Sequence, residues 1–490
     1  MNRAGTFPDR PEEEPTMKLS PLQVLSDCEL KSLHEASLHI LEHVGVKIGS
    51  ARMFEFLRAR GLSVEAETQI VRFPRAVIEE EIAKAPAQFE VCGRHGRPAF
   101  LLGDGVPKIA AGHNAVFWLD SETGVTRRSR IEDVAIFARI CQHLQHLDMI
   151  GIPVMPQDVP NQSASLLYGV RAVIENSDKP VFFSTDKADV NRACIELLRA
   201  AFEGDFDTHV YGLSQLSPTS PLTWEGSVLD AIMDTVTTGV PLAILPEPNA
   251  GVSAPFTLAG LLTVNNAECL SGLAMVQMLR PGHKVMYANS WTTTDMRTGA
   301  ALVGSVETSI CRIAGAQLAR FYGVPSHTTA PNSDNHAHDE QNAWEKTLST
   351  FVSVGAGNDL IVNCGMFATG MTCSHEQLVM DEEISALSRR LARGVTVSDE
   401  TIARDLIEAI GPQGPTYLTT DHTMNHLRSD EYHTPSVAVR GPFASWQAEG
   451  SPDIVAQSRA KAYELAALPV PHLEADRKTR LAAIIADFGD

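Results

Sequence analysis

From residue 107 onward the sequence alternates between short apolar runs and amphipathic segments, and this alternation constrains the fold more than any other feature. Runs that are apolar throughout, rather than at every second position, are typical of parallel strands covered by helices. Eight strand–helix units within about 285 residues predict a (β/α)8 TIM barrel rather than an open, doubly wound sheet. The expected strands are 107–112, 148–154, 179–184, 209–216, 241–248, 283–290, 324–331 and 358–366. The helical patterns that follow them lie near 130–145, 163–177, 188–203, 225–238, 257–279, 306–322, 340–356 and 374–393.

The segments on either side of the barrel are expected to be helical. A first helix should begin at Ser26, because S-D-C-E forms a capping box, and Gly45 is suited to end it. Further helices are expected near 50–60 and from Pro74. The sequence therefore predicts four segments: a disordered tail (1–20), an N-terminal α-rich cap (21–106), the barrel (107–394) and a C-terminal helical extension (395–490).

Composition excludes several classes of protein. The net charge of −20 argues against a nucleic-acid partner, because no basic excess is present to neutralise phosphates. No apolar leader is visible and no run of 18 apolar residues occurs, so we expect no membrane association. The eight cysteines form no C-x-x-C pair and lie mostly in apolar patterns, as free thiols do in a reducing compartment. These features favour a cytoplasmic protein.

Polar and aromatic side chains gather where the expected strands end. In a barrel of this type the active site lies at the carboxyl ends of the strands, so these positions are candidates without any motif. They are His113 and Asn114 after the first strand, Gln215 after the fourth, Glu247 after the fifth, Asn289 and Trp291 after the sixth, and Phe367 after the eighth.

The stretch SDNHAHDEQ (333–341) follows the seventh expected strand and has three interpretations. His336 and His338 are two apart, which places both on one face of a strand and permits a zinc site if a third ligand is nearby. The letters also resemble the D-x-H-x-x-G box of cobalamin-binding modules, but Asp339 stands at the glycine position, so we attribute the match to chance. As a plain polar loop, the stretch would bring Asp334 and His336 to the mouth of the barrel.

Several long strings, in order along the chain, resemble the trimethylamine methyltransferase family. The resemblance implies a TIM barrel that binds a methylated amine, while a separate corrinoid protein presents cob(I)alamin, so this chain would bind no cofactor or metal itself. Because only standard residues are present, the chain resembles the branch without pyrrolysine, which demethylates quaternary amines such as glycine betaine. The strings are LDSETGVTRRSRIEDV (119–134), NSDKPVFFS (176–184), PEPNAGVSAPFTLAGLLTVNNAECLSGLAMVQMLRPG (246–282), DMRTGA (295–300), ARFYGVPSH (319–327), GMFATGMTCSHEQLVMDEEI (365–384) and TTDHTMNHLRSDEYHTP (419–435).

Aromatic ring faces and carboxylates bind a cationic amine. If the substrate also has a carboxylate, hydrogen-bond donors bind that group. Strand-end position alone supplies the candidates, and no catalytic residue is assigned. The substrate-binding set is His113, Asn114, Glu247, Asn289, Trp291, Asp334, His336 and Phe367.

Two other functions remain open from the sequence. One is a metal-dependent barrel hydrolase or lyase that uses His336 and His338. The other is a non-catalytic amine-binding relative. The expected partners are a corrinoid-binding protein and a small methylated amine, with no nucleic acid and no membrane, and the chain is a candidate homo-oligomer.

Overall fold

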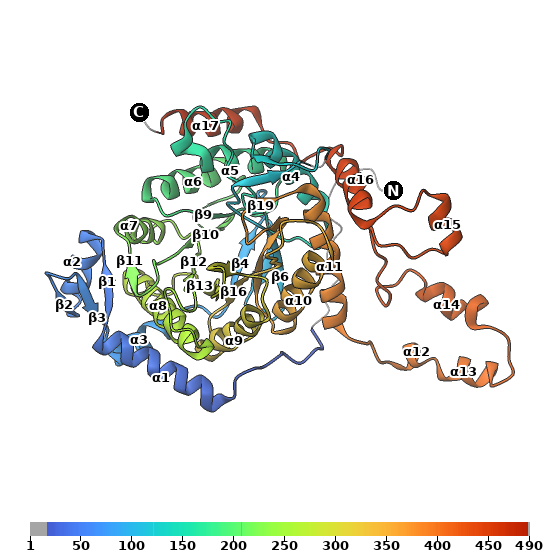
Figure 1. Cartoon of the computed structure of the whole chain (residues 1–490), viewed down its shortest axis with the longest axis horizontal. Helices are drawn as coiled ribbons and strands as arrows, with labels where there is room; N and C mark the ends of the chain where they lie inside the picture. Colours follow the sequence, from blue (N-terminus) through green and yellow to red (C-terminus); the bar gives the residue numbers. More distant parts are fainter. Residues whose placement is uncertain (1–16, 121, 207, 489–490) are drawn as a thin grey trace.

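A parallel sheet that curves into a barrel forms the centre of the molecule (Figure 1). The computed structural model describes residues 17–120, 122–206 and 208–488. Seven strands pair in the order β6-β17-β16-β13-β12-β10-β9, and every pair is parallel. They are β6 (Lys108–Ala111), β9 (Phe182–Ser184), β10 (Leu213–Leu216), β12 (Leu242–Ile244), β13 (Val285–Asn289), β16 (Ser326–Thr329) and β17 (Leu360–Cys364).

The segment 148–154 closes the barrel between its two end strands. Backbone bridges join Ala110 to Met149 on one side and Ile150 to Val181 on the other, both in parallel. This is the second of the eight expected strands, present as an extended segment with bridges rather than a full ladder. The predicted barrel is therefore confirmed.

Eight helices cover the outside of the barrel at the predicted places. Serine, threonine and aspartate side chains cap several of them, including Thr257, Ser305, Asp339 and Ser374. Their apolar faces pack on the outward side of the strands and form the two largest hydrophobic clusters. The helices are α4 (Ile131–His143), α5 (Ser165–Asn176), α6 (Ala188–Ala201), α7 (Gly226–Thr235), α8 (Leu258–Leu279), α9 (Val306–Tyr322), α10 (Glu340–Gly355) and α11 (His375–Arg393).

The N-terminal segment contains strands as well as the three expected helices. Helix α1 (Asp27–His43) has the predicted capping box at Ser26, and α2 (Ala51–Ala59) and α3 (Arg75–Ile82) follow. Strands β1 (Val46–Ile48), β2 (Ser63–Glu65) and β3 (Ile70–Arg72) form a small sheet with β11 (Thr223–Trp224). The expectation of an α-rich segment overlooked these strands, which are only three residues long.

A hairpin of β4 (Phe89–Cys92) and β5 (Pro98–Leu102) packs into the barrel interior. Phe89, Val91, Phe100 and Leu102 share one buried cluster with inward side chains of the barrel strands. In Figure 1 β4 lies within the ring of strands. The hairpin precedes β6, so it fills the end of the barrel where the strands begin and leaves the opposite end for a site.

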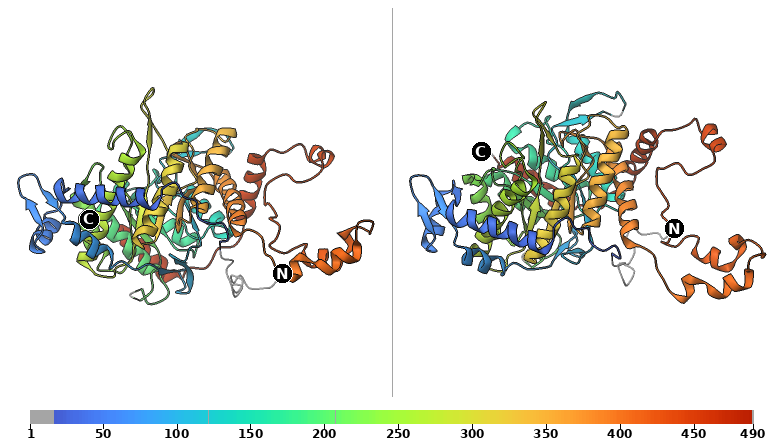
Figure 2. Two further views of the ribbon diagram at one scale, coloured as in Figure 1. Left: turned by 90° about the horizontal axis from the view of Figure 1, so that it is seen from below. Right: turned by 60° about the horizontal axis from the view of Figure 1, so that its bottom comes forward.

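Short strands extend the loops at that opposite end, which we call the mouth. In the left view of Figure 2 the β14–β15 hairpin, coloured yellow-green, rises above the other loops at this end of the barrel. These strands are β7 (Phe117–Leu119) and β8 (Thr126–Arg128) after β6, β14 (Thr293–Asp295) and β15 (Ala300–Leu302) after β13, and β18 (Met366–Phe367) and β19 (Thr372–Cys373) after β17. A 3-10 turn, η1 (Gln162–Ala164), leads into α5.

The chain beyond the barrel is helical, as expected. Helix α16 (Ile454–Ala466) packs on α11 and α4, and α17 (Ala475–Ala486) packs on α6 and α5. Between α11 and α16 lie α12 (Asp399–Ile402), α13 (Arg404–Ile410), η2 (Tyr417–Thr419), α14 (Asp421–His426) and α15 (Phe443–Ala448).

The predicted disordered tail falls mostly on residues 1–16, which lie outside the described residues. The last part of it is ordered, because the N–H groups of Lys18 and Leu19 donate to the carbonyl of Ala392 at the end of α11. None of the described helices is long and apolar enough to cross a membrane.

Candidate functional site

Alternation along the strands decides which side chains enter the barrel. Successive residues of a strand face opposite sides of the sheet, so every second residue points to the barrel axis. Ala243 and Leu245 belong to the interior cluster, and the same alternation brings Glu247 to the mouth. By the same rule Leu213 precedes Gln215 on the inner face of β10, and Phe182 precedes Ser184 on that of β9.

Two histidines and an aromatic ring lie together near the inner end of the mouth. The ring of Phe182 is 4.8 Å from that of His113 and 5.5 Å from that of His327, measured between centroids. Burial lowers the pKa of His113 to about 4 and that of His327 to about 3, and the proximity of His113 adds to the second shift. Both imidazoles are therefore neutral at pH 7 and act as hydrogen-bonding groups rather than as charges.

Several polar atoms of this region have no partner among the described residues. Gln215 donates weakly to Ser184 Oγ at 3.3 Å, and its Nε2 lies 3.4 Å from His113 Nε2, yet its Oε1 is unpaired. His113 Nδ1 and both ring nitrogens of His327 are also unpaired, and His327 is fully buried. Buried polar groups without partners cost about 1–3 kcal/mol each. Such a group of donors and acceptors is suited to a polar ligand that pairs with them.

Glu247 is an acidic group at the mouth. Its side chain is exposed to solvent. The protein around it nevertheless desolvates the carboxyl group and raises its pKa to about 7. No described residue donates a hydrogen bond to it or forms an ion pair with it. An unpaired carboxylate in a partly desolvated opening attracts a cation. The structure therefore offers an anion at the mouth and neutral hydrogen-bonding groups below it.

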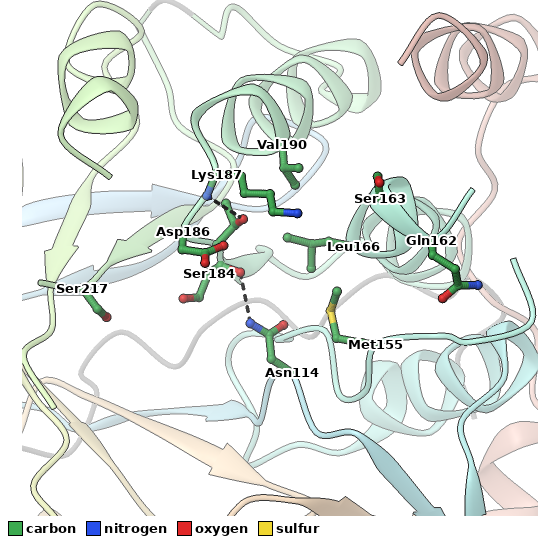
Figure 3. A pocket seen from close by; sticks show the side chains of 11 residues that line it. Asn114, Met155, Gln162, Ser163, Leu166, Ser184, Asp186, Lys187, Val190 and Ser217 are labelled. Atoms are coloured by element: carbon green, nitrogen blue, oxygen red, sulfur yellow. Dashed lines mark hydrogen bonds between the residues drawn. The ribbon is translucent and has the colours of Figure 1, made fainter. Parts of the chain in front are cut away.

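A side pocket of about 350 Å³ opens beside these groups (Figure 3). Asn114, which has a left-handed φ of 62°, donates from its amide to the backbone carbonyl of Ser184, and its Oδ1 is unpaired. Ser184 also contacts Gln215, so the pocket adjoins the histidine pair. The other side chains at its wall come from the segment after 148–154, from η1 and α5, and from the loop between β9 and α6 with the first turn of α6. They are Met155, Gln162, Ser163, Leu166, Thr185, Asp186, Lys187 and Val190, with Ser217 opposite.

The stretch 333–341 forms a structural turn. Asp334 accepts hydrogen bonds from the N–H groups of Val303 and Gly304 at 2.7 and 3.0 Å and so ties this turn to the end of the β14–β15 hairpin. Asp339 caps the start of α10 through the N–H groups of Gln341 and Asn342. These contacts occupy both carboxylates.

The two histidines of this stretch are separated in the fold. His336 is exposed, whereas His338 is half-buried, with its ring 4.9 Å from that of Phe367 and its Nε2 3.1 Å from Ser374 Oγ. Across the described part of the chain, no three His, Cys, Asp or Glu side chains form a group that could hold a metal ion. The structure thus gives no support to the hydrolase interpretation based on His336 and His338.

Three further candidates do not face the mouth. Met286 and Ala288 point into the barrel, so Asn289 points outward, where its Oδ1 accepts from Thr328 Oγ1. Trp291 is buried in a cluster behind the sheet with residues of α8 and α9. Phe367 is buried against His338. Of the eight candidates, the structure brings His113, Asn114 and Glu247 to the mouth, where His113 lies beside Gln215 and Asn114 donates to the carbonyl of Ser184.

His327 and Phe182 are not among the candidates predicted from the sequence, because both lie inside strands and the candidates were chosen at strand ends. The strand S-H-T-T is polar at every position, which is unusual for a buried parallel strand and was the available signal.

The chain matches the family model described as "Trimethylamine methyltransferase (MTTB)" over residues 2–487. It is 30% identical over 459 residues to trimethylamine methyltransferase MttB of Methanosarcina thermophila, which covers 91% of this chain and 92% of the relative. It is 28% identical over 481 residues to the glycine betaine methyltransferase of Desulfitobacterium hafniense strain Y51, covering 96% and 98%.

Among solved structures, the fold is similar to the Methanosarcina barkeri monomethylamine methyltransferase MtmB, with a TM-score of 0.52 at 14% identity over 89% of this chain and 87% of that one. A hydroxylamine complex of MtmB gives a TM-score of 0.54 at 14% identity, covering 90% and 88%. The structural likeness supports the barrel fold, and the family match spans nearly the whole sequence. The chain belongs to the trimethylamine methyltransferase family.

Proposed function

We propose that this protein removes a methyl group from a quaternary methylated amine with a polar tail, of which glycine betaine is the model, and passes it to cob(I)alamin on a separate corrinoid protein. The observation that carries the proposal is Glu247 at the mouth together with polar atoms of His113, His327 and Gln215 that have no partner among the described residues. Membership of the methyltransferase family supplies the reaction class.

The two parts of the site suit the two ends of such a substrate. The Glu247 carboxylate attracts the ammonium group and keeps it at the open end of the barrel. The neutral imidazoles of His113 and His327 donate N–H groups to a carboxylate or other acceptor on the tail. This orientation points the N-methyl groups outward, toward an incoming partner.

The proposed reaction requires little acid–base catalysis from this chain. A quaternary nitrogen already carries its positive charge, so the amine leaves as a neutral tertiary amine when the N–CH3 bond breaks, and no proton has to be supplied. Neutral histidines with lowered pKa values fit this requirement. The contribution of the barrel is to bind, align and partly desolvate the methyl group, and alignment of this kind contributes about 7–11 kcal/mol in favourable cases.

Cob(I)alamin on the partner supplies the nucleophile that accepts the methyl group. The surface around the mouth fits a protein partner, because exposed apolar side chains follow several strand ends. They are Phe117 in β7, Val252 and Phe256 between β12 and α8, Met296 in the β14–β15 hairpin and Met371 before β19.

The test is methyl transfer to free cob(I)alamin, followed by the absorbance of methylcobalamin. Glycine betaine, choline and trimethylamine form a matched panel, since choline keeps the quaternary nitrogen but lacks the carboxylate, and trimethylamine is tertiary. We expect transfer from glycine betaine, weaker transfer from choline and none from trimethylamine. Equal transfer from trimethylamine would refute the quaternary assignment. Tight binding of glycine betaine with no transfer would instead identify a non-catalytic amine-binding relative.

A further inference from the structure

A segment after the barrel, residues 395–432, extends away from the rest of the molecule, and we call it the C-terminal arm. It contains α12, α13, η2 and α14, and none of these elements has a buried residue. The arm returns to the body where Arg390 donates to the carbonyl of Glu431 and His433 Nε2 lies 2.7 Å from Glu383 Oε1. Figures 1 and 2 show the arm projecting sideways from α11, beyond the ring of helices.

The arm is folded locally but lacks a core. Its helices are four to seven residues long, and helices of this length do not persist in water without packing against other structure. They nevertheless have caps, with Ser398 before α12 and Thr420 before α14. The arm also exposes a series of large apolar side chains, namely Val395, Val397, Ile402, Ile407, Tyr417, Leu418, Met424, Leu427 and Tyr432. Ordered helices with exposed apolar residues imply a surface that covers them.

A second exposed apolar surface lies on α10 and α11, next to the base of the arm. On α10, Ala343, Trp344, Leu348 and Phe351 line an open groove of about 570 Å³, and Trp344 is 62% exposed. Leu387 and Leu391 on α11 are also exposed, and α11 packs against α10. We call these residues of α10 and α11 the receiving face.

The positions of these two surfaces select a second copy of the chain as the occupant. In a two-fold dimer both copies use the same surface patch, so this patch must contain the arm as well as the surface on which the partner's arm packs. The arm leaves directly from α11, beside the receiving face, and therefore meets this condition. The arm extends sideways rather than over the mouth (Figure 2), so a partner that delivers a group to the mouth would not cover it.

The geometry points to a homodimer in which the C-terminal arm of each copy packs on the receiving face of the other. The exchange buries the exposed apolar residues of both surfaces and leaves both mouths open. It involves neither the histidine pair nor Glu247, so it stands independently of the proposed activity.

Mass measurement by light scattering during size exclusion, on the full chain over a wide concentration range, tests this arrangement. We expect about twice the 53.1 kDa of one chain. Trp344→Glu in the receiving face and Leu418→Asp in the arm should each weaken dimerisation at least about thirtyfold, the loss typical of an interface anchor. The matched control is Val44→Asp, at the exposed apolar residue that follows α1, and this variant should stay dimeric. Figure 1 shows α1 away from the arm.

A mixture of the two interface variants separates exchange from other modes of assembly. Trp344→Glu keeps an intact arm and Leu418→Asp keeps an intact receiving face, so the mixture should form heterodimers through one good contact although each variant alone is monomeric. Hydrogen exchange should also show protected amides in α13 and α14 of the wild type and loss of that protection in Trp344→Glu. A monomeric wild type, an arm protected in a monomer, or dimers unaffected by both variants would overturn the proposal.

Discussion

The raised pKa of Glu247 makes substrate binding pH-dependent in a calculable way. With a pKa of about 7, the free carboxylate is about 90% ionised at pH 8 and about 10% ionised at pH 6. Only the ionised form attracts a quaternary ammonium, so the affinity should rise about tenfold from pH 6 to pH 8. The substrate's own carboxylate is ionised throughout this range, and His113 and His327, with pKa values near 4 and 3, do not titrate in it.

Calorimetric titration with glycine betaine at pH 6, 7 and 8 measures this dependence. Glu247→Gln removes the charge at nearly constant shape, so it should bind more weakly at pH 8 and show almost no change of affinity with pH. Glu225→Gln, at the start of α7 outside the mouth, is the matched control and should retain the wild-type profile. A flat profile for the wild type, or the same slope in Glu247→Gln, would refute the role of this carboxylate.

Three further substitutions test other parts of the structure. Lys346 Nζ lies 2.8 Å from Asp381 Oδ2 with both side chains fully buried, so Lys346→Met should lower the free energy of unfolding by about 3–5 kcal/mol, and an unchanged urea midpoint would contradict this. His327→Leu removes a buried imidazole without partners, so it should raise the free energy of unfolding by about 1 kcal/mol while weakening amine binding; a variant that binds normally would exclude His327 from the site. Gly315→Ala would place a Cβ 2.4 Å from the ring of Trp291, so it should cost about 1–3 kcal/mol by overpacking, and a neutral effect would show that this ring can move.

The sequence was sufficient to predict the barrel because its helices and strands differ in length and period. It was not sufficient to predict which strand-end side chains enter the mouth. The residues 285–289 of β13 are buried on both faces, so no hydrophobic alternation distinguishes inward from outward positions. Ala288 faces the barrel interior, so the side chain of the next residue, Asn289, faces the helices outside the sheet.

Tertiary contacts also determine which carboxylates of the polar loop at 333–341 are available to a ligand. Asp334 and Asp339 look available in the sequence, but backbone N–H groups of the β14–β15 hairpin and of α10 occupy them. Glu247, by contrast, accepts no hydrogen bond from any residue that the structure describes. Whether a carboxylate has a hydrogen-bond partner depends on loops that are distant in the sequence, so local sequence patterns cannot predict it.

The most direct test of the central claim is the stoichiometry of a single turnover with glycine betaine and cob(I)alamin. Mass spectrometry of the amine and absorbance of the corrinoid follow the two products in one sample. We predict one dimethylglycine for each methylcobalamin formed, with the rate strongly reduced in Glu247→Gln. Absence of both products, with glycine betaine and cob(I)alamin at saturating concentrations, would contradict the account.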